Sequence, residues 1–273
     1  MNSNWCLFTS YDDNFKRVSS FAIPAMKKYA AKHCMDFDEH VNFQCGRPVS
    51  WSKIYLALDK FALGYEYIFW VDADAVFCRF DEDIRSLITS DADIYYALEN
   101  IGQDRSRLNA GVWVMRNTHD TLKFLHRIIS LDRYTNHKWW EQAAIIEALG
   151  LRSMFDNDDH GIDAPTEFMK KVAWLPNRWN SFAGMDYNPT ANIRHFIALD
   201  NNGKEIAMRI DALISRLEPE RSSMAEEEFL QITKLLWKSC IRKVHVHQRM
   251  YAPRTLQNIS RFFRGRPLSV LAK

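Results

Sequence analysis

Apolar residues in the first 150 positions follow two alternating patterns. Short, nearly continuous apolar runs bounded by polar residues are typical of buried strands, and longer segments with an apolar residue every three or four positions are typical of helices. Strands that alternate with helices predict an α/β sandwich around a mostly parallel sheet. The predicted strands are 5–11, 36–43, 65–72, 93–99 and 109–117, and the predicted helices are 15–34, 50–62, 83–90, 119–131 and 138–150.

The rest of the chain is organised differently. Residues 151–203 have the pattern of short strands and loops, and from about residue 204 the pattern is mainly helical, except for a strand-like alternation at 242–250. No internal repeat and no flexible linker separates these parts. We therefore expect one domain over residues 1–205 and a helical, basic C-terminal extension over residues 206–273 that packs on it.

Composition points to an ordinary globular protein. The 273 residues, 47% hydrophobic and 26% charged, can bury a full core. The five cysteines form no CxxC pair, which argues against a disulfide scaffold or a structural zinc site and for a reducing compartment. No apolar stretch is long enough to span a membrane, and the N-terminus has no signal-peptide pattern, so we expect a cytoplasmic protein.

Charge is unevenly distributed along the chain. The net charge is only +2, yet residues 229–273 contain ten Lys and Arg and no Asp or Glu, directly after an acidic stretch at 218–228. Such a basic segment suits an anionic membrane surface or phosphorylated ligands, and it is equally typical of a solvated helical face. No nucleic-acid-binding motif is present, so we expect no nucleic-acid partner.

The stretch YIFWVDADAVF at 67–77 ends an apolar strand with two acids, Asp72 and Asp74. Both side chains then lie outside the carboxyl edge of a parallel sheet, where ligands bind in open α/β folds. Two carboxylates this close repel each other unless a cation shares them, and Mg²⁺ or Mn²⁺ prefers such oxygen ligands, often together with phosphate oxygens. Alternatively, either acid caps the following segment or pairs with Arg79 or Arg85.

An Asp-x-Asp pair after an apolar strand resembles the motifs of two enzyme families. In phosphatases of the haloacid dehalogenase type the first Asp is a nucleophile and the second an acid, and DADAV fits locally, with FDNDD at 155–159 as a later acidic cluster. That motif normally ends the first strand of its fold, whereas about 65 residues precede it here. In metal-dependent glycosyltransferases of the A fold (GT-A) about this much chain comes first, and the pair holds a divalent ion on the diphosphate of a nucleotide-sugar.

Five further stretches occur along the chain with the acidic pair among them: SWSKIYLALDKF, LNAGVWVMRNT, WWEQAAI, WLPNRWNSF and RHFIALDNNGK. In this order they resemble glycosyltransferase family 34, which includes yeast α-galactosyl and α-mannosyl transferases and plant xyloglucan xylosyltransferases. The likeness runs from about residue 5 to residue 205. It implies a GT-A fold, a Rossmann-type α/β/α sandwich, and a retaining enzyme that moves a hexose or pentose from a nucleotide-sugar to a glycan or glycolipid acceptor. A UDP-sugar is favoured over GDP-mannose as donor.

The resemblance also implies a metal site. Carried over residue by residue, the ligands of Mn²⁺, or of Mg²⁺, are Asp72, Asp74 and His195. Imidazole suits Mn²⁺ better than Mg²⁺. His195 could instead be a strand histidine satisfied by backbone groups. His245 and His247 are rival ligands, because their spacing places both on one face of a strand.

The donor site of the family falls on several short segments. Thr9 to Tyr11, at the end of the first strand, would seat the base, with Tyr11 stacking on it, and Ala73 would contact the donor between the two acids. Asn109 matches a position at the sugar, and Gly111 would let the backbone approach. Without a ligand, Asn109 to Gly111 would only form a turn before a strand.

The WWEQ segment matches the family's acid-and-amide pair near the reacting carbon. Glu141 would stabilise positive charge there or act as a nucleophile, and Gln142, being neutral, would orient or stabilise. Glu141 could otherwise be a surface acid in the first turn of a helix. Trp139 and Trp140 would form a platform for an acceptor sugar, or belong to the core.

Basic residues match the family less well. Lys53 occupies a position where the family has a basic residue near the nucleotide, although a helix-surface lysine would look the same. The His-Phe segment of the family normally continues through Gly and Cys to a lysine that helps to bind diphosphate. Here Ala198 and Leu199 replace Gly and Cys, and Asp200 stands at about the lysine position. Lys204 would have to substitute for that lysine through a shifted loop.

Eukaryotic members of family 34 carry an N-terminal membrane anchor, which this sequence lacks, so we expect a microbial, cytoplasm-facing relative that builds a surface glycan. The basic segment 229–273 would add peripheral contact with the inner face of an anionic membrane. Two other functions stay open at this point: the phosphatase, and a non-catalytic glycan-binding descendant of the transferase fold.

Overall fold

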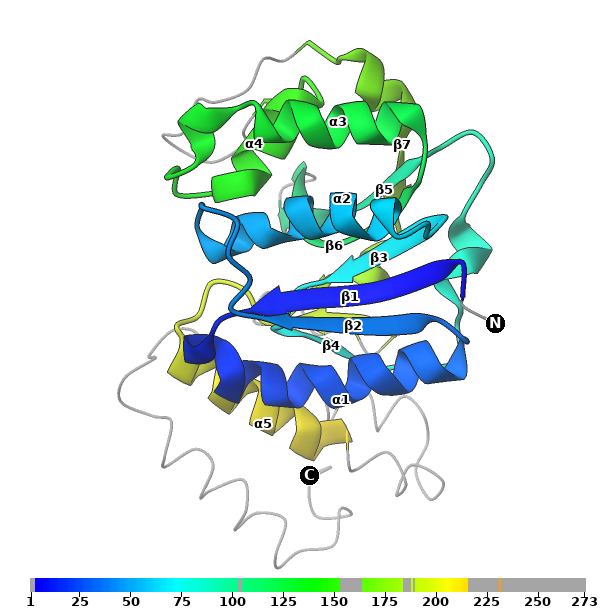
Figure 1. Ribbon diagram of the computed structural model, residues 1–273. Helices are drawn as coiled ribbons and strands as arrows, with labels where there is room; N and C mark the ends of the chain where they lie inside the picture. The colour runs from blue at the N-terminus through cyan, green and yellow to red at the C-terminus, as the bar shows by residue number, and fades with distance from the viewer. Residues whose placement is uncertain are drawn as a thin grey trace, which may run out of the picture.

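The computed structural model describes residues 3–102, 105–152, 164–183, 188, 190–215 and 231. Its central sheet consists of β1 (Trp5–Tyr11), β2 (Asp36–Val41), β3 (Tyr67–Val71), β5 (Ile94–Gly102), β6 (Arg105–Arg116) and β7 (Val172–Leu175). The strand order is β2-β1-β3-β6-β5-β7 (Figure 1). β6 is antiparallel to both β3 and β5, whereas all the other neighbours in this sheet are parallel. The predicted mostly parallel sheet is therefore confirmed.

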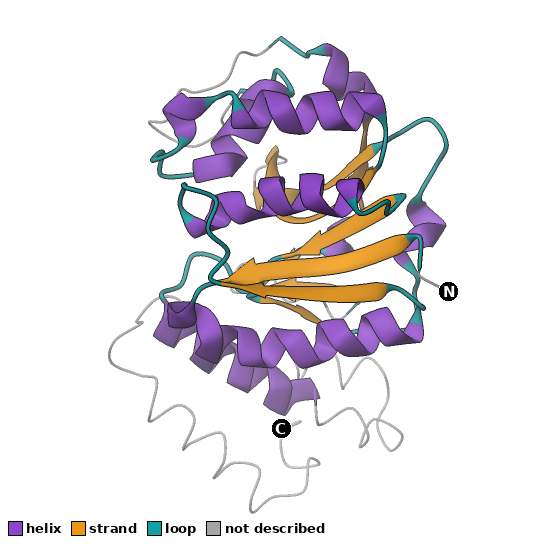
Figure 2. Cartoon of the chain, in the orientation of Figure 1, coloured by secondary structure: helices purple, strands orange, loops and turns teal. Residues whose placement is uncertain are grey.

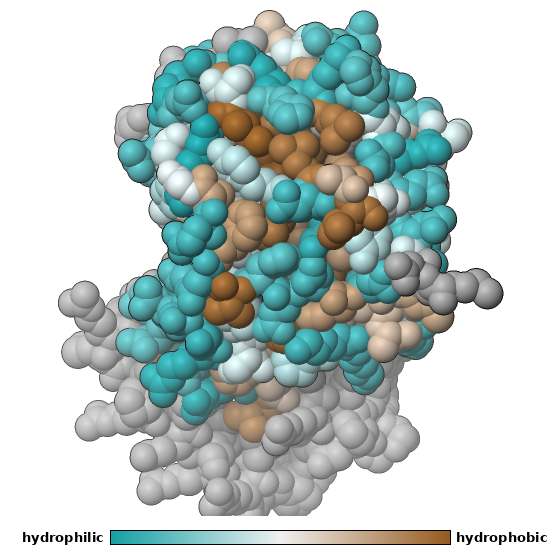
Figure 3. All heavy atoms as spheres, in the orientation of Figure 1, coloured by the Kyte–Doolittle hydropathy of each residue, from teal (hydrophilic) through white to brown (hydrophobic). Residues whose placement is uncertain are grey.

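Helices cover both faces of the sheet (Figures 1 and 2). One face carries α1 (Lys16–Lys32) and α5 (Asn201–Ser215), and the other carries α2 (Ser52–Ala62), α3 (His119–Ile129) and α4 (Trp140–Ala148). The hydrophobic side chains between the layers form two cores, one on each face of the sheet. This arrangement confirms the predicted α/β/α sandwich. On the face seen in Figure 3, hydrophobic residues show mainly over the layer of α2 and α3, and hydrophilic residues cover much of the remainder.

The strand β3 explains why its sequence is apolar at every position. Phe69 and Val71 point into the core on the α1 side, and Ile68 and Trp70 point into the core on the α2 side. A strand covered by helices on both faces needs apolar residues on both, rather than alternation. Its last residue therefore marks the point where the chain leaves the core, and the acidic pair follows at once.

A second, three-stranded sheet begins directly after the acidic pair. It consists of β4 (Ala75–Phe77), β9 (Ile193–His195) and β8 (Ser181–Phe182), in the order β4-β9-β8. β4 is antiparallel to β9, and β8 is parallel to it. The sequence pattern did not predict β4 as a separate strand, because three residues are too few to show a period. Pairing with β9, more than a hundred residues later, makes it a strand.

Turns of 3-10 helix connect these elements at Asp13–Phe15 (η1), Val49–Trp51 (η2), Ile84–Leu87 (η3), Asp132–Tyr134 (η4), Glu167–Lys171 (η5) and Asn177–Trp179 (η6). η3 stands where a short helix was predicted at 83–90. The other predicted helices of the first 150 residues correspond to α1, α2, α3 and α4, with ends that differ by a few residues.

Several predictions concern residues outside those that the structure describes. These are the FDNDD cluster at 155–159, the strand-like stretch at 242–250 with His245 and His247, and nearly all of the basic segment 229–273. α5 extends across the predicted boundary between residues 205 and 206, and the division into a domain and an extension stays a prediction. Within the described residues, no helix combines the length and the apolar character needed to cross a membrane.

Candidate metal centre and donor cavity

The acidic pair lies at the junction of the two sheets. Asp72 follows the last residue of β3, and its N–H donates a hydrogen bond of 2.8 Å to the carbonyl of Gly111 in β6. The chain then turns, because Ala75 N–H bonds back to the carbonyl of Asp72 at 2.9 Å, and Asp74 comes directly before β4. In the register of β4 and β9, Ala75 faces His195. Main-chain pairing in two sheets thus brings His195 next to both acids.

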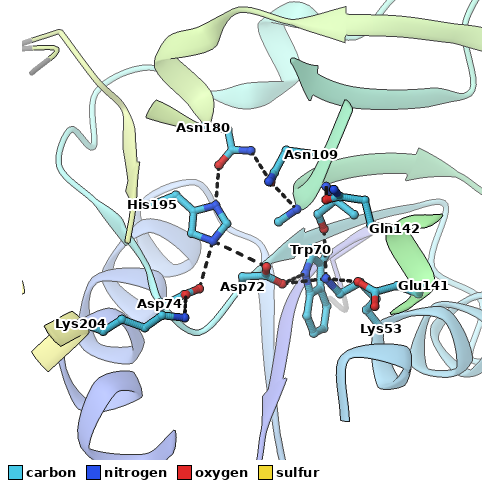
Figure 4. A network of polar contacts seen from close by, with 12 residues as sticks. Lys53, Trp70, Asp72, Asp74, Asn109, Glu141, Gln142, Asn180, His195 and Lys204 are labelled. Carbon is cyan, nitrogen blue, oxygen red and sulfur yellow. Dashed lines mark hydrogen bonds and ion pairs between the residues drawn. The ribbon is translucent and has the colours of Figure 1, made fainter. Parts of the chain in front are cut away.

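Asp72, Asp74 and His195 form a group that could hold a metal ion, since one ligand atom from each lies within 4.8 Å of the others. His195 Nε2 is 3.1 Å from Asp74 Oδ1 and 3.7 Å from Asp72 Oδ2 (Figure 4). Asp74 and His195 are buried, and Asp72 is partly exposed towards the cavity. Two carboxylates and an imidazole are a donor set that suits Mn²⁺ and, with water, Mg²⁺. The residues present therefore fit a divalent cation.

A buried lysine holds Asp72. Lys53 Nζ lies 2.9 Å from Asp72 Oδ1 and 2.9 Å from Glu141 Oε1, and it donates to the carbonyl of Ala110 at 3.2 Å. Trp70 Nε1 donates a further hydrogen bond of 2.7 Å to Asp72 Oδ1. Burial by itself would lower the pKa of Lys53, but the carboxylates of Asp72 and Glu141 raise it above its usual value. Lys53 is therefore a permanently charged member of the site, and the alternative of a helix-surface lysine is wrong.

A different lysine holds Asp74. Lys204, in the first turn of α5, places its Nζ 2.5 Å from Asp74 Oδ2. Burial would raise the pKa of Asp74, yet Lys204 and His195 together lower it below its ordinary value. Asp74 is thus kept as a carboxylate. The predicted alternative pairing with Arg85 is wrong, since Arg85 binds Asp83 instead.

These side chains line a cavity of about 420 Å³ at the carboxyl ends of β1 and β3. The volume lies within the range of small-molecule sites. Among the described residues that line it, four are acidic and two are lysines, so the lining is acidic on balance. The charged members are Asp12, Asp72, Asp74, Glu141, Lys53 and Lys204.

Most of the predicted donor residues meet in this cavity. Its lining includes Tyr11, Lys53, Ala73, Asn109, Gly111, Glu141, Gln142 and His195, together with the acidic pair. Thr9 is absent from the lining, because its side chain is fully buried within β1, and its neighbour Ser10 lines the cavity instead. The Tyr11 hydroxyl donates to Glu39 Oε1 at 2.5 Å.

The WWEQ segment contributes one buried acid and one tethered amide. Glu141 is only 4% exposed, and burial raises its pKa against the opposing effect of Lys53. It is therefore no surface acid, although it does stand in the first turn of α4. Gln142 Oε1 accepts a hydrogen bond of 3.0 Å from the N–H of Ala110, which leaves its amide nitrogen as the group to donate.

A comparison with known protein families decides what kind of protein carries this cavity. A family model described as nucleotide-diphospho-sugar transferase matches residues 4–171. The chain belongs to this family. It is therefore a glycosyltransferase of the nucleotide-diphospho-sugar type, as predicted, whereas its place in family 34 stays a prediction. In this transferase the acidic pair follows β3 and not the first strand, which agrees with the transferase motif rather than with that of the phosphatase.

Solved structures share the fold of this nucleotide-diphospho-sugar transferase. A glycosyltransferase involved in the glycosylation of the major capsid of PBCV-1 aligns with a TM-score of 0.58 and 13% identity, over 76% of this chain and 98% of that one. The glycosyltransferase GlyE of Streptococcus pneumoniae TIGR4 aligns with a TM-score of 0.52 and 12% identity, over 74% of this chain and 56% of that one. These likenesses confirm the GT-A fold. No curated protein matches the sequence.

Two features of the transferase site were not assigned from the sequence. Asn180, which follows η6, is hydrogen-bonded to both His195 and Asn109. The stretch WLPNRWNSF, which contains it, is part of the family resemblance, but the resemblance assigned no role to Asn180. Ala198 adopts a φ of 58°, in the left-handed region that favours glycine. The family resemblance expects Gly here, a residue for which this conformation carries no steric cost.

Proposed function

We propose that this protein is a retaining, divalent-cation-dependent glycosyltransferase of the family 34 type. It moves a hexose or pentose from a nucleotide-sugar, a UDP-sugar rather than GDP-mannose, to a glycan or glycolipid. The supporting observation is that Asp72, Asp74 and His195 converge in a cavity whose described lining has two more acids than lysines. A nucleoside diphosphate is itself anionic, so such a cavity favours it only in company with a cation.

The chain's own residues would then hold the diphosphate on two sides. A divalent cation bound by the three ligands supplies charge neutralisation and Lewis acidity at the leaving diphosphate. Lys204 already lies at the cavity with its Nζ on Asp74, and this ammonium would donate to a phosphate oxygen of the donor. Lys204 thus replaces the family lysine whose usual position is occupied by Asp200. Lys53 is fixed between two carboxylates and positions Asp72 rather than the phosphate.

The sugar would lie between the acidic pair and the start of α4. Gln142 and Asn109 both line the cavity, and each has its amide oxygen bound by a main-chain N–H, so the nitrogen is the group left to donate to sugar hydroxyls. Glu141 is held by Lys53, and its negative charge stabilises positive charge that develops on the sugar ring. Its burial and ion pair favour this electrostatic role over that of a nucleophile.

The transfer breaks the bond between the anomeric carbon and the phosphate oxygen and forms one to the acceptor hydroxyl oxygen. The bonding electron pair leaves with the nucleoside diphosphate, which also takes the hydroxyl proton. The acceptor arrives on the face that the phosphate leaves, which retains the anomeric configuration. Catalysis by these residues is then mainly positioning and electrostatic stabilisation.

The acceptor side of the cavity carries the tryptophan pair. Trp139 and Trp140 line it, and Trp140 is 45% exposed with a φ of 42°, an unusual conformation for an aromatic residue. An exposed indole at the opening of a sugar site offers an apolar face to a sugar ring. If the acceptor is lipid-linked, the basic segment 229–273 would hold the enzyme at an anionic surface, at roughly 1 kcal/mol per basic residue near the membrane.

The first test is a donor screen that follows release of UDP or GDP from a panel of nucleotide-sugars, with Mn²⁺, with Mg²⁺ and with EDTA. We expect release from one donor, loss of release in EDTA and in Asp74→Asn, and no loss in Asp81→Asn. Asp81 is a matched control because it follows β4 closely and its side chain is 96% exposed. The anomeric configuration of the product, read by NMR, then tests retention.

The alternatives predict other results. A non-catalytic descendant would bind nucleotide or glycan and release no nucleoside diphosphate from any donor. A phosphatase would hydrolyse an aryl phosphate and leave nucleotide-sugars intact. Either result, from folded wild-type protein, would contradict the proposed transferase.

A further inference from the structure

A chain of buried hydrogen bonds runs from the main chain of β6 to the far side of the His195 ring (Figure 4). The N–H of Gly111 donates to Asn109 Oδ1 at 2.9 Å, and Asn180 Nδ2 donates to the same oxygen at 2.9 Å. Asn180 Oδ1 then lies 2.9 Å from His195 Nδ1. Asn109, Asn180 and His195 are 8%, 1% and 2% exposed, so water does not compete for these bonds.

The direction of every bond in this chain follows from its first member. A main-chain N–H can only donate, so the atom of Asn109 that faces Gly111 must be its oxygen. That oxygen can only accept, so Asn180 must turn its NH₂ group towards it. The remaining oxygen of Asn180 faces His195, and it can only accept as well. His195 Nδ1 must therefore carry a proton.

The other ring nitrogen is the one that faces the acidic pair. Because Nδ1 keeps its proton on Asn180, Nε2 is the nitrogen whose lone pair is left for a cation, and it lies 3.1 Å from Asp74 Oδ1. The ring cannot easily turn, since a Cβ at Gly111 would come within 2.2 Å of His195 Cε1, which means that the ring lies directly against this backbone. The proton on Nδ1 and the orientation of the His195 ring are thus set before a cation arrives.

We propose that Asn180 is a positioning residue that fixes the Nδ1–H tautomer of His195, so that Nε2 presents its lone pair to the divalent cation shared with Asp72 and Asp74. This inference rests on the proposed function, because it assumes that the three side chains take a cation. It assigns Asn109 a second task besides any contact with the donor, that of orienting the Asn180 amide. Groups that orient a metal-binding histidine typically change metal affinity by about 10- to 100-fold when they are removed.

The fold also places Asn180 for this task. It follows η6, whose Trp179 is fully buried, and its main-chain N–H bonds to the carbonyl of Asn177 at 3.1 Å. Asn192, the residue before β9, ties η6 to this strand, because its main-chain N–H bonds to the carbonyl of Arg178 at 2.7 Å. The amide therefore reaches His195 from a rigid segment on the side opposite the acids.

The test compares Asn180→Leu with Asn180→Asp in the full-length protein. Leu removes the acceptor for Nδ1–H, and we expect a mixture of His195 tautomers and Mn²⁺ binding that is about 10- to 100-fold weaker. Asp keeps an acceptor oxygen for Nδ1–H but replaces the NH₂ group that faces Asn109 Oδ1 by an oxygen, so we expect a less stable protein that keeps the Nδ1 proton and binds Mn²⁺ within a few-fold of wild type. Asn177→Leu is the control, because Asn177 belongs to the same turn but is exposed.

Two readouts separate this role from a merely structural one. Imidazole ¹⁵N NMR of the metal-free protein, with His195→Gln to assign the signal, reports whether Nδ1 carries a proton, without any cation or donor. Electron paramagnetic resonance of Mn²⁺ then reports affinity. A wild-type ring protonated on Nε2 alone would overturn the inference, as would Leu and Asp variants that lose Mn²⁺ equally with an unchanged tautomer. Failure of the transferase proposal would instead appear in the donor screen, with the tautomer as described.

Discussion

The two aspartates of the acidic pair stand two residues apart and yet belong to two differently built halves of the site. On the Asp72 side, the partners are Lys53 and Trp70, which are 19 and 2 residues away in the sequence. On the Asp74 side, the partners are His195 and Lys204, which are 121 and 130 residues away. The first half is built from α2, β3, β6 and the start of α4. The second half forms only when β9 and α5 pack beside β4.

The two halves also differ in how charge is balanced. Lys53 is 4% exposed and lies between two carboxylates, so its removal leaves both without their cation. Lys204 neutralises one carboxylate and its side chain is 14% exposed. The Asp72 side is therefore bound into the core permanently, whereas Lys204 can leave Asp74 when a cation takes its place. We therefore expect Lys53 to contribute mainly to the stability of the fold and Lys204 mainly to the binding of cation and donor.

The largest expected effect is on the Asp72 side. Lys53→Met leaves Asp72 and Glu141 as close, uncompensated carboxylates, and we expect the free energy of unfolding to fall by about 3–5 kcal/mol. Denaturation in urea measures this loss. Lys60→Met is the matched control, since Lys60 is a second buried lysine of α2 that pairs with Asp38 away from the cavity. The Lys60→Met variant should be less stable than wild type and should still release nucleoside diphosphate from the donor. A Lys53→Met protein as stable as wild type would contradict the comparison.

A smaller effect, with opposite signs for two ligands, is expected on the Asp74 side. In Lys204→Met the competing ammonium is gone from Asp74, so we expect Mn²⁺ alone to bind several-fold more tightly. UDP in the presence of Mn²⁺ should bind about tenfold more weakly, because a charged hydrogen bond to phosphate contributes about 1.5–3 kcal/mol. Calorimetric titration measures both. Lys32→Met, which removes a surface lysine paired with Asp81, should change neither affinity. Equal loss of both ligands would show that Lys204 only supports the fold.

The same division explains what could be predicted from the sequence. Strands such as β1 and β3 are encoded locally, by apolar runs covered on both faces, and the acidic pair marks where β3 leaves the core. The direction of β6 and the existence of β4 depend on distant pairing partners, and local patterns do not contain that information. Asp72 and Asp74 were found from their own chemistry, but His195 was assigned only through a family resemblance.

Asn180 is an example of a site residue that could not be predicted from the sequence. Its amide acts through two hydrogen bonds, to Asn109 and His195, which are 71 and 15 residues away. Nothing in an asparagine beside a tryptophan indicates such partners. Candidate metal ligands can be recognised in a sequence by residue type. The side chains that orient those ligands can be identified only from the tertiary structure, which brings them into contact. Thr9 illustrates the converse, because strand alternation turns it into the core and turns the buried Ser10 towards the cavity instead.

The smallest expected effect concerns a clamp on the Asp74 side. Glu82 accepts hydrogen bonds from Arg178 Nε at 3.0 Å and from Asn192 Nδ2 at 2.7 Å, and so ties the segment before η3 to the turn that positions Asn180. The hydrogen bonds from Arg178 hold the pKa of Glu82 below its usual value, against the opposing effect of burial. The side chains of Glu82 and Arg178 are 34% and 36% exposed, so solvent screens the pair and we expect it to contribute at most about 1 kcal/mol.

The sign of its pH dependence follows from the lowered pKa. The unfolded chain binds the Glu82 proton more tightly than the folded protein, so the stabilisation is fully present above the unfolded pKa of about 4.3 and is lost as the pH falls through the folded value. Wild type should therefore exceed Glu82→Gln in urea unfolding at pH 7, and the difference should shrink towards pH 3.5. A double-mutant cycle with Arg178→Met isolates the pair. A gap that stays constant as the pH falls would mean that Glu82 contributes independently of its charge, and that the Asp74 side is held together without this ion pair.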